Sequence, residues 1–166
     1  MFNNIFNNNN MVELQNILRE KNQTITCAES CTGGLCSYMI TQISGSSSIF
    51  KGGVVTYCND IKEQELNVKK DTMIKYGAVS KQTVSQMLDG VKKKFNADFA
   101  IAISGVAGPS GGTKDKPVGT VVIGIIDPNN AKIIEIYNFD GTREEVQIQA
   151  AKTAFRNIFD IFMKNS

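Results

Sequence analysis

Residues 99–103 spell Phe-Ala-Ile-Ala-Ile, a run without a polar side chain. A strand with one face in the core alternates apolar and polar residues, whereas a continuous apolar run is typical of a strand covered on both faces. Strands of that kind belong to sheets that carry helices on both sides. The run therefore predicts an α/β fold in which a central sheet lies between two layers of helices.

The segments around this strand predict a mixed sheet. Alternating, β-branched stretches predict further strands at residues 24–28, 54–58, 120–126 and 132–139. Helical spacing of apolar residues predicts helices at residues 11–20, 33–43, 60–66, 72–76, 80–95 and 142–163. The last two strands flank the turn at residues 127–130 and form a hairpin, which argues against a purely parallel sheet. We expect a three-layer α/β/α architecture.

The chain is predicted to form a single domain over residues 11–166. A length of 166 residues suits one domain with one sizeable core. No interior stretch is long and polar enough to act as a linker. Residues 1–10 include six asparagines, and we expect this segment to be disordered.

The absence of histidine excludes whole classes of catalysis. Neither a Ser-His-Asp triad nor a Cys-His pair can form, so acid–base chemistry must come from Lys, Tyr, Asp, Glu or Cys. The four cysteines contain no C-x-x-C pair, and a zinc site is not expected. We expect Cys27, Cys31, Cys36 and Cys58 to be small buried thiols that stay reduced. No metal or cofactor is predicted.

The net charge of +2 predicts neither a nucleic-acid nor a membrane partner. The one lysine run, residues 92–94, falls late in a predicted helix, where cations favour the helix dipole. No stretch is apolar enough to span a bilayer, and the first residues do not resemble a signal peptide. We therefore expect a cytoplasmic protein.

The first segment that could carry out chemistry is Thr26-Cys27-Ala28-Glu29-Ser30-Cys31-Thr32-Gly33-Gly34. It leads from a predicted strand into a helix, which places Ser30 near free backbone N–H groups that could stabilise an oxyanion. Gly33 and Gly34 allow a close approach of backbone or ligand. The alternative is an ordinary helix cap made by Ser30 or Thr32.

The second segment places Tyr57 and Lys62 on either side of a strand-to-helix junction, where both can face one cleft. Lysine is a poor base at its ordinary pKa of about 10.4, but burial lowers that pKa. In a chain without histidine, lysine is the natural partner for a serine. The alternative is a solvated helix residue.

The third segment is the glycine-rich loop from Ser104 to Thr120, which we call the glycine loop. It follows the buried strand 99–103, and open α/β sheets tend to bind ligands at that edge. Its glycines, hydroxyls and lysine suit an anion such as phosphate, although the spacing is not that of a Walker motif. The alternative is a mobile surface loop.

Together these segments resemble one known family, the C-terminal domain of CinA proteins, whose stand-alone form is nicotinamide-nucleotide amidohydrolase (PncC). The resemblance covers nearly the whole chain after residue 11. It is carried by the stretches 26–34, 45–47, 50–57, 77–80, 105–120 and 139–143. Ser104 stands where the family has threonine, and Thr142 stands where the family's G-D-R motif has an acidic residue.

The resemblance implies deamidation of nicotinamide mononucleotide to nicotinic acid mononucleotide and ammonia. It implies Ser30 as the nucleophile, Lys62 as the base and Tyr57 as a further catalytic residue. The implied substrate-binding residues are Thr32, Gly33, Gly34, Ser104, Gly105, Gly108, Gly111, Gly112 and Arg143. The partner is then a small pyridine nucleotide, and the oligomeric state stays open, a homo-oligomer included.

Three alternatives stay open at this point. Arg143 can bind the phosphate of the nucleotide, or it can form a surface ion pair with Glu144 or Glu145. The chain can be a non-catalytic nucleotide-binding module. It can also be a cysteine amidase that uses Cys31 or Cys27.

Overall fold

The computed structural model describes residues 1–164 as alternating helices and strands. The helices are α1 (Asn8–Glu20), α2 (Leu35–Thr41), α3 (Asn59–Leu66), α4 (Lys70–Tyr76), α5 (Lys81–Phe95) and α6 (Arg143–Lys164), with a short 3₁₀ helix η1 (Ser46–Ser48). The strands are β1 (Ile25–Glu29), β2 (Phe50–Val55), β3 (Phe99–Gly105), β4 (Thr120–Ile126) and β5 (Lys132–Asn138).

The strands form one mixed sheet in the order β2-β1-β3-β4-β5. β1 pairs in parallel with both β2 and β3, whereas β4 is antiparallel to β3 and to β5. The predicted mixed sheet is therefore confirmed, and the hairpin supplies its antiparallel edge. The carboxyl ends of β1, β2 and β3 all lie at the same edge of the sheet.

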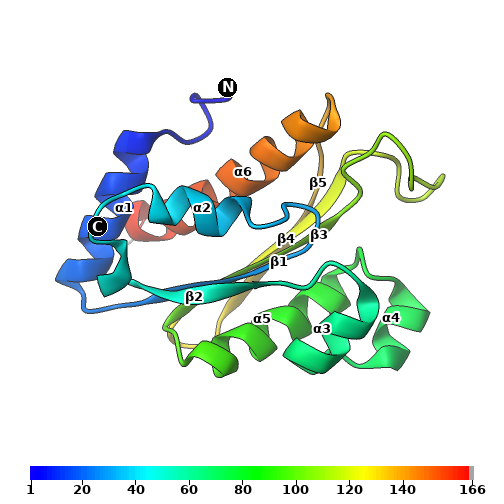
Figure 1. Cartoon of the computed structure of the whole chain (residues 1–166), viewed down its shortest axis with the longest axis horizontal. Helices are drawn as coiled ribbons and strands as arrows, with labels where there is room; N and C mark the ends of the chain where they lie inside the picture. Colours follow the sequence, from blue (N-terminus) through cyan, green and yellow to red (C-terminus); the bar gives the residue numbers. More distant parts are fainter. Residues whose placement is uncertain (165–166) are drawn as a thin grey trace.

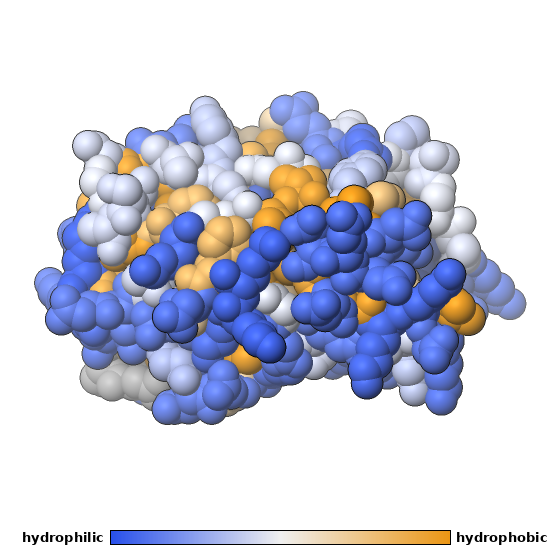
Figure 2. Space-filling view, turned by 60° about the horizontal axis from the view of Figure 1, so that its bottom comes forward, coloured by the Kyte–Doolittle hydropathy of each residue, from blue (hydrophilic) through white to orange (hydrophobic). Residues whose placement is uncertain are grey.

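Helices cover both faces of the sheet, as the apolar run in β3 predicts (Figure 1). One core joins α1, α2 and α6 to Phe99, Ile101 and Ile103, and the other joins α3, α4 and α5 to Ala100 and Ala102. The small side chains on the second face let α5 approach closely. Figure 2 brings the side with α3, α4 and α5 forward and shows mainly hydrophilic side chains over it, with smaller hydrophobic areas between them.

The asparagine-rich N-terminus is ordered, which corrects the prediction of disorder over residues 1–10. Asn7 and Asn10 form a reciprocal capping box, and α1 begins at Asn8. Phe6 is only 1% exposed and packs against the rings of Phe155 and Phe159 on α6. A capped helix start and a buried aromatic ring together hold the segment on the domain.

Strand β2 begins and ends earlier than the strand predicted at residues 54–58. It begins earlier because two glycines lie within the strand and face packed neighbours. A Cβ on Gly53 would lie 2.7 Å from Ser37 Oγ, and one on Gly52 would lie 2.8 Å from the Phe95 ring. These glycines are therefore strand residues that let α2 and α5 approach, and they are not part of a loop. Since β2 ends at Val55, residues 56–58 form the connection to α3.

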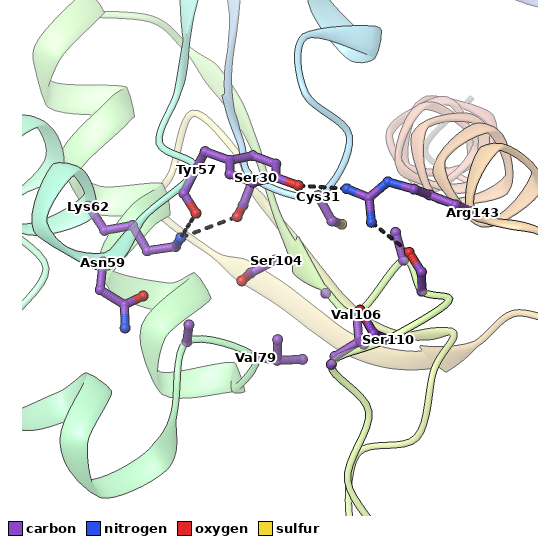
Figure 3. A pocket seen from close by; sticks show the side chains of 15 residues that line it. Ser30, Cys31, Tyr57, Asn59, Lys62, Val79, Ser104, Val106, Ser110 and Arg143 are labelled. Atoms are coloured by element: carbon purple, nitrogen blue, oxygen red, sulfur yellow. Dashed lines mark hydrogen bonds between the residues drawn. The ribbon is translucent and has the colours of Figure 1, made fainter.

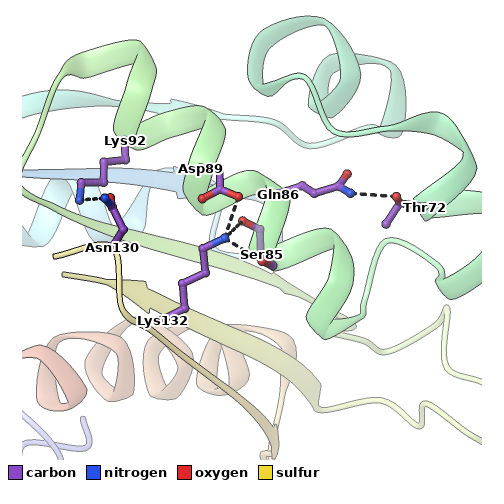
Figure 4. Close-up of polar contacts among 7 residues, drawn as sticks. All are labelled: Thr72, Ser85, Gln86, Asp89, Lys92, Asn130 and Lys132. Atoms are coloured by element: carbon purple, nitrogen blue, oxygen red, sulfur yellow. Dashed lines mark hydrogen bonds and ion pairs between the residues drawn. The ribbon is translucent and has the colours of Figure 1, made fainter. Parts of the chain in front are cut away.

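Lysines at the end of α5 and on β5 fasten the terminal hairpin to the helix layer (Figure 4). Lys92 Nζ donates to Asp127 O at 2.6 Å and to Asn130 Oδ1 at 2.8 Å. Lys132 Nζ contacts Asp89 Oδ2 at 2.7 Å. Lys92, the first residue of the lysine run, thus holds the hairpin turn against the end of α5. Within residues 1–164, no helix has the length and apolarity needed to cross a membrane.

We predict that Gly90→Ala destabilises the fold by separating α5 from α3. A Cβ on Gly90 would overlap the carbonyl oxygen of Leu66, which is backbone and cannot turn away. Overpacking of this kind costs about 1–3 kcal/mol. The urea midpoint should fall accordingly, whereas Lys93→Ala on the exposed side of α5 should change stability by less than about 0.5 kcal/mol. A Gly90→Ala protein as stable as the parent would contradict this close approach.

Candidate functional site

Ser30 lies at the carboxyl end of β1, in a turn of residues 30–34 that we call the nucleophile turn. Its backbone N–H donates to Ile103 O on β3 at 3.1 Å, and its side chain is buried. The positions of β1 and β3 in the sheet therefore fix the serine at the edge where open α/β sheets bind ligands.

Glu29 holds the nucleophile turn against α2, a role that the sequence analysis did not assign. Its Oε1 accepts from Thr32 Oγ1 and from Cys36 N, both at 2.8 Å. Its Oε2 accepts from Ser37 N at 3.1 Å and from Ser37 Oγ at 2.9 Å. Glu29, rather than Ser30 or Thr32, thus caps α2, and the Cys36 and Ser37 amides are not free for an oxyanion. The sequence signal for this capping role was an acidic residue at the junction between a strand and a short helix.

Lys62 reaches from α3 to Ser30 with a buried amine (Figure 3). Its Nζ lies 3.2 Å from Ser30 Oγ, 2.8 Å from Thr56 O and 3.4 Å from Tyr57 O. The side chain is 1% exposed, and none of the ion pairs within residues 1–164 involves it. Burial lowers the pKa of Lys62 below its ordinary value. Lys62 is therefore not a solvated helix residue.

Tyr57 is exposed and turns its hydroxyl away from Lys62. The hydroxyl accepts from Arg143 Nη2 at 2.6 Å, whereas the Tyr57 backbone carbonyl faces the lysine amine. Figure 3 shows the ring beside the serine, with its oxygen directed to the arginine. A proton relay through this hydroxyl is not supported by the geometry, because its oxygen is engaged on the other side of the site.

Arg143, the first residue of α6, spans the site. Its Nη1 donates to Gly108 O at 2.6 Å, so the guanidinium joins the glycine loop to Tyr57. The alternative ion pair with Glu144 or Glu145 is wrong, because no ion pair within residues 1–164 involves Arg143. Both partners of the guanidinium are neutral, which leaves its positive charge for an anion.

These residues line one open cavity of about 270 Å³. The predicted residues that line it are Ser30, Tyr57, Lys62, Ser104, Gly105, Gly108, Gly111 and Arg143. The cavity is also lined by Cys31, which the sequence analysis considered only as an alternative nucleophile, and by residues for which it expected no individual role: Asn59, Ala78, Val79, Val106, Ala107 and Ser110. Their places follow from tertiary packing, which no local spacing signals.

Four predicted substrate-binding residues lie outside this cavity. Thr32, Gly33 and Gly34 line a separate hollow beside α2 and α6, and Gly112 lines neither. The Thr32 hydroxyl already donates to Glu29. In the structure Thr32, Gly33 and Gly34 shape the nucleophile turn, and the backbone N–H of Thr32 is left without an oxygen acceptor among residues 1–164.

Backbone amides on both sides of the cavity have no oxygen acceptor among residues 1–164. In the nucleophile turn these are the N–H of Cys31, which lines the cavity, and the N–H of Thr32, the next residue in the chain. In the glycine loop they are the N–H groups of Ala107, Gly108, Ser110 and Gly111. Successive unpaired amides make a concave site for negative charge, so the cavity has donors at both ends.

The three buried cysteines are poor nucleophiles in this setting. Burial raises the pKa of the Cys31 thiol to about 12. Burial, and then the Glu29 charge, raises the pKa of Cys27 and of Cys36 well above the usual range. Cys58 is exposed, contrary to the expectation of four buried thiols. Within residues 1–164, no three His, Cys, Asp or Glu side chains gather as a metal site.

Comparison with known proteins finds relatives over almost the whole chain. The CinA C-terminal domain profile matches residues 7–162. A CinA-like protein of Thermotoga neapolitana is 47% identical over 142 residues, which are 86% of this chain and 34% of the relative. A CinA-like protein of Prochlorococcus marinus is 48% identical over 151 residues, 90% of this chain and 36% of the relative. The chain thus spans about a third of these curated relatives.

Solved structures share the fold along nearly their full length. A competence/damage inducible protein of Agrobacterium tumefaciens has a TM-score of 0.90 at 34% identity, covering 93% of this chain and 94% of that one. A CinA superfamily protein of Klebsiella pneumoniae has a TM-score of 0.90 at 30% identity, covering 95% of this chain and 98% of that one. The mixed five-stranded sheet between helices is therefore the fold of these structures.

We predict that Lys62 makes stability depend on pH in a way that Lys62→Met removes. In the unfolded chain the amine titrates near 10.5, whereas in the folded protein its pKa is lower. Between the two pKa values the unfolded state binds more protons, so the Lys62 contribution to the free energy of unfolding rises with pH. Urea denaturation from about pH 6 to about pH 10 should show the parent gaining stability relative to Lys62→Met. A constant difference over this range would mean that the amine titrates alike in both states.

Proposed function

The chain belongs to the CinA C-terminal domain family, and we propose that it is an amidohydrolase that converts nicotinamide mononucleotide to nicotinic acid mononucleotide and ammonia. The observation that carries the proposal is the 3.2 Å contact between Lys62 Nζ and Ser30 Oγ inside the cavity. A serine needs an adjacent base to become a nucleophile, and this chain has no histidine to supply one.

The surroundings of Lys62 are compatible with an uncharged amine that acts as a base. Two of its three polar neighbours are carbonyl oxygens, of Thr56 and Tyr57, and these can only accept. The two N–H bonds of an uncharged amine satisfy both carbonyls, so its lone pair faces Ser30 Oγ. The lowered pKa makes that uncharged form accessible.

In the first half-reaction, Ser30 Oγ attacks the carboxamide carbon while its proton moves to Lys62 Nζ. The carbonyl oxygen becomes an oxyanion, for which the unpaired amides of Cys31 and Thr32 are the nearest candidates in the nucleophile turn. The Lys62 ammonium then protonates the departing nitrogen, the C–N bond breaks, and ammonia leaves an ester on Ser30.

In the second half-reaction, water hydrolyses the ester. Lys62, uncharged again, takes a proton from water, and the hydroxide attacks the ester carbon. The C–O bond to Ser30 then breaks and Ser30 recovers its proton from Lys62. The product leaves as a carboxylic acid that gives up its proton to water. No step in this scheme requires a metal ion or an organic cofactor.

The charge and the amides at the other end of the cavity support a site there for the phosphate of the mononucleotide. Arg143 carries a positive charge that no carboxylate neutralises, and the glycine loop offers unpaired amides beside it. Binding energy from such a remote group can hold the carboxamide against Ser30. The product of this reaction would serve cytoplasmic recycling of pyridine nucleotides.

We predict that Ser30→Ala abolishes ammonia release from nicotinamide mononucleotide. The nucleophile's loss should lower kcat by at least about three orders of magnitude. Stability should change by no more than about 1–2 kcal/mol, because Ser30 does not cap α2. The measurement is coupled detection of ammonia from purified parent and variant.

Two outcomes would contradict the proposal. A parent that binds the mononucleotide but releases no ammonia would be a nucleotide-binding module. A Ser30→Ala variant within tenfold of the parent, combined with an inactive but folded Cys27→Ala/Cys31→Ala protein, would indicate a cysteine mechanism.

Arg143→Ala should separate phosphate recognition from chemistry at the amide. If Arg143 binds the phosphate, kcat/KM for the mononucleotide should fall. The corresponding loss of transition-state stabilisation should be about 1.5–3 kcal/mol, the scale of a hydrogen bond to a charged group. Nicotinamide riboside, which lacks the phosphate, should lose much less. Arg156→Ala is the matched control, because Arg156 forms an exposed pair with Asp160 on the same helix. Equal losses on both substrates would assign Arg143 to the scaffold or to the amide end.

A further inference from the structure

A glutamine on α6 holds the nucleophile turn from outside the cavity. Gln147 Nε2 donates to Cys31 O at 2.7 Å, which joins two residues 116 positions apart. Cys31 is the residue directly after the serine, and Gln147 does not line the cavity that contains Ser30. The amide therefore acts on the backbone of the turn and has no direct access to a ligand there.

This hydrogen bond sets the direction of a backbone donor. In a trans peptide, C=O and N–H point in opposite directions. The carbonyl of Cys31 is turned toward α6, so the Thr32 N–H of the same peptide unit points away from α6. That N–H has no oxygen acceptor among residues 1–164. Gln147 thus orients a backbone amide of the nucleophile turn that has no oxygen acceptor.

Helix α6 is a firm support for this contact. Val146, Ala150 and Ala151 bury the neighbouring helix face in the core. Arg143 lies one helical turn before Gln147, and residues four apart share a face of a helix. The first two turns of α6 therefore contact the glycine loop and Tyr57 through Arg143, and the nucleophile turn through Gln147.

The opposite side of the nucleophile turn is held independently. Glu29 accepts from Thr32 Oγ1, and Ile103 O accepts from Ser30 N. Loss of Gln147 therefore leaves a turn that is still attached to β1, β3 and α2. Its expected effect is a small change in the position of Ser30 and of the Thr32 amide, not unfolding.

We propose that Gln147 is a positioning residue that sets the geometry of Ser30 and of the adjacent backbone donors through the Cys31 carbonyl. The proposal rests on the proposed amidohydrolase function for its role in turnover. It predicts a loss in the chemical step without a loss of substrate binding. A small misplacement of reacting groups costs up to about a hundredfold in rate.

The test compares Gln147→Glu with Gln149→Glu in the full chain. Glutamate at 147 puts a carboxylate against the Cys31 carbonyl and removes the donor. Gln149 offers a close match, since its Nε2 also donates to backbone carbonyls, of Asp140 at 2.8 Å and Glu145 at 3.2 Å, but none of these belongs to the nucleophile turn. Both variants add the same charge to the same helix.

We expect Gln147→Glu to lower kcat on nicotinamide mononucleotide by about ten- to a hundredfold, with KM within about twofold of the parent. The pH dependence of kcat should keep its midpoint, because Lys62 is untouched. Gln149→Glu should match the parent in both constants. Gln147→Met, which removes the donor without adding charge, should also lower kcat and serves if the glutamate variant does not fold.

A second readout separates this proposal from the proposed substrate. A fluorophosphonate labels activated serines without requiring a nucleotide, so its rate of reaction with Ser30 reports the nucleophile alone. Slower labelling of the Gln147 variants than of Gln149→Glu supports the proposal even if the parent does not deamidate the mononucleotide. Equal labelling rates would overturn it, and so would a raised KM with an unchanged kcat.

Discussion

The site depends on an amine that is buried without a counter-ion. A charged ammonium is unfavourable in such surroundings, so the pKa of Lys62 falls and the uncharged form becomes accessible. A neighbouring carboxylate would cancel this effect by favouring the charged form. Glu29, the residue before Ser30, is buried, but its two oxygens accept four hydrogen bonds from Thr32 and the start of α2. The two ionisable groups therefore have separate roles, one in holding the turn and one in the proposed chemistry.

The architecture brings this amine to the serine through close approaches that only small residues permit. Gly90 lets α5 lie against the end of α3, one turn after Lys62, and Ala100 and Ala102 let α5 lie against the sheet. The carbonyls of Thr56 and Tyr57 come from the segment just after β2, so the early end of that strand supplies the acceptors for Nζ. The Lys62 amine is therefore positioned by backbone carbonyls, and these remain when the side chains of Thr56 and Tyr57 are substituted.

The sequence predicted the parts of the fold whose signals are local. The apolar run in β3 and the turn between β4 and β5 are sufficient for the layers and the mixed sheet. The lack of histidine, together with the family resemblance, singled out Ser30 and Lys62. The start of β2 was missed because its glycines are explained by Ser37 and Phe95, which are far from them in sequence. The roles of Gln147 and of the Tyr57 hydroxyl also depend on long-range contacts. The capping box at Asn7 was not predicted, because the asparagines around it favoured an interpretation as a disordered segment.

The position of β1 in the sheet has a consequence for how such a site can diverge. The chain leaves β1 toward β2 on one side and returns through β3 on the other, so β1 and β3 flank a topological switch point. Bond cleavage is assigned to the segments after β1 and β2, whereas anion recognition is assigned to the loop after β3 and the start of α6. These are separate stretches of chain on one rigid sheet. Insertions or substitutions in the glycine loop can therefore change which remote group of the substrate is bound, while the serine and lysine keep their geometry. Substrate range and chemistry can then evolve independently.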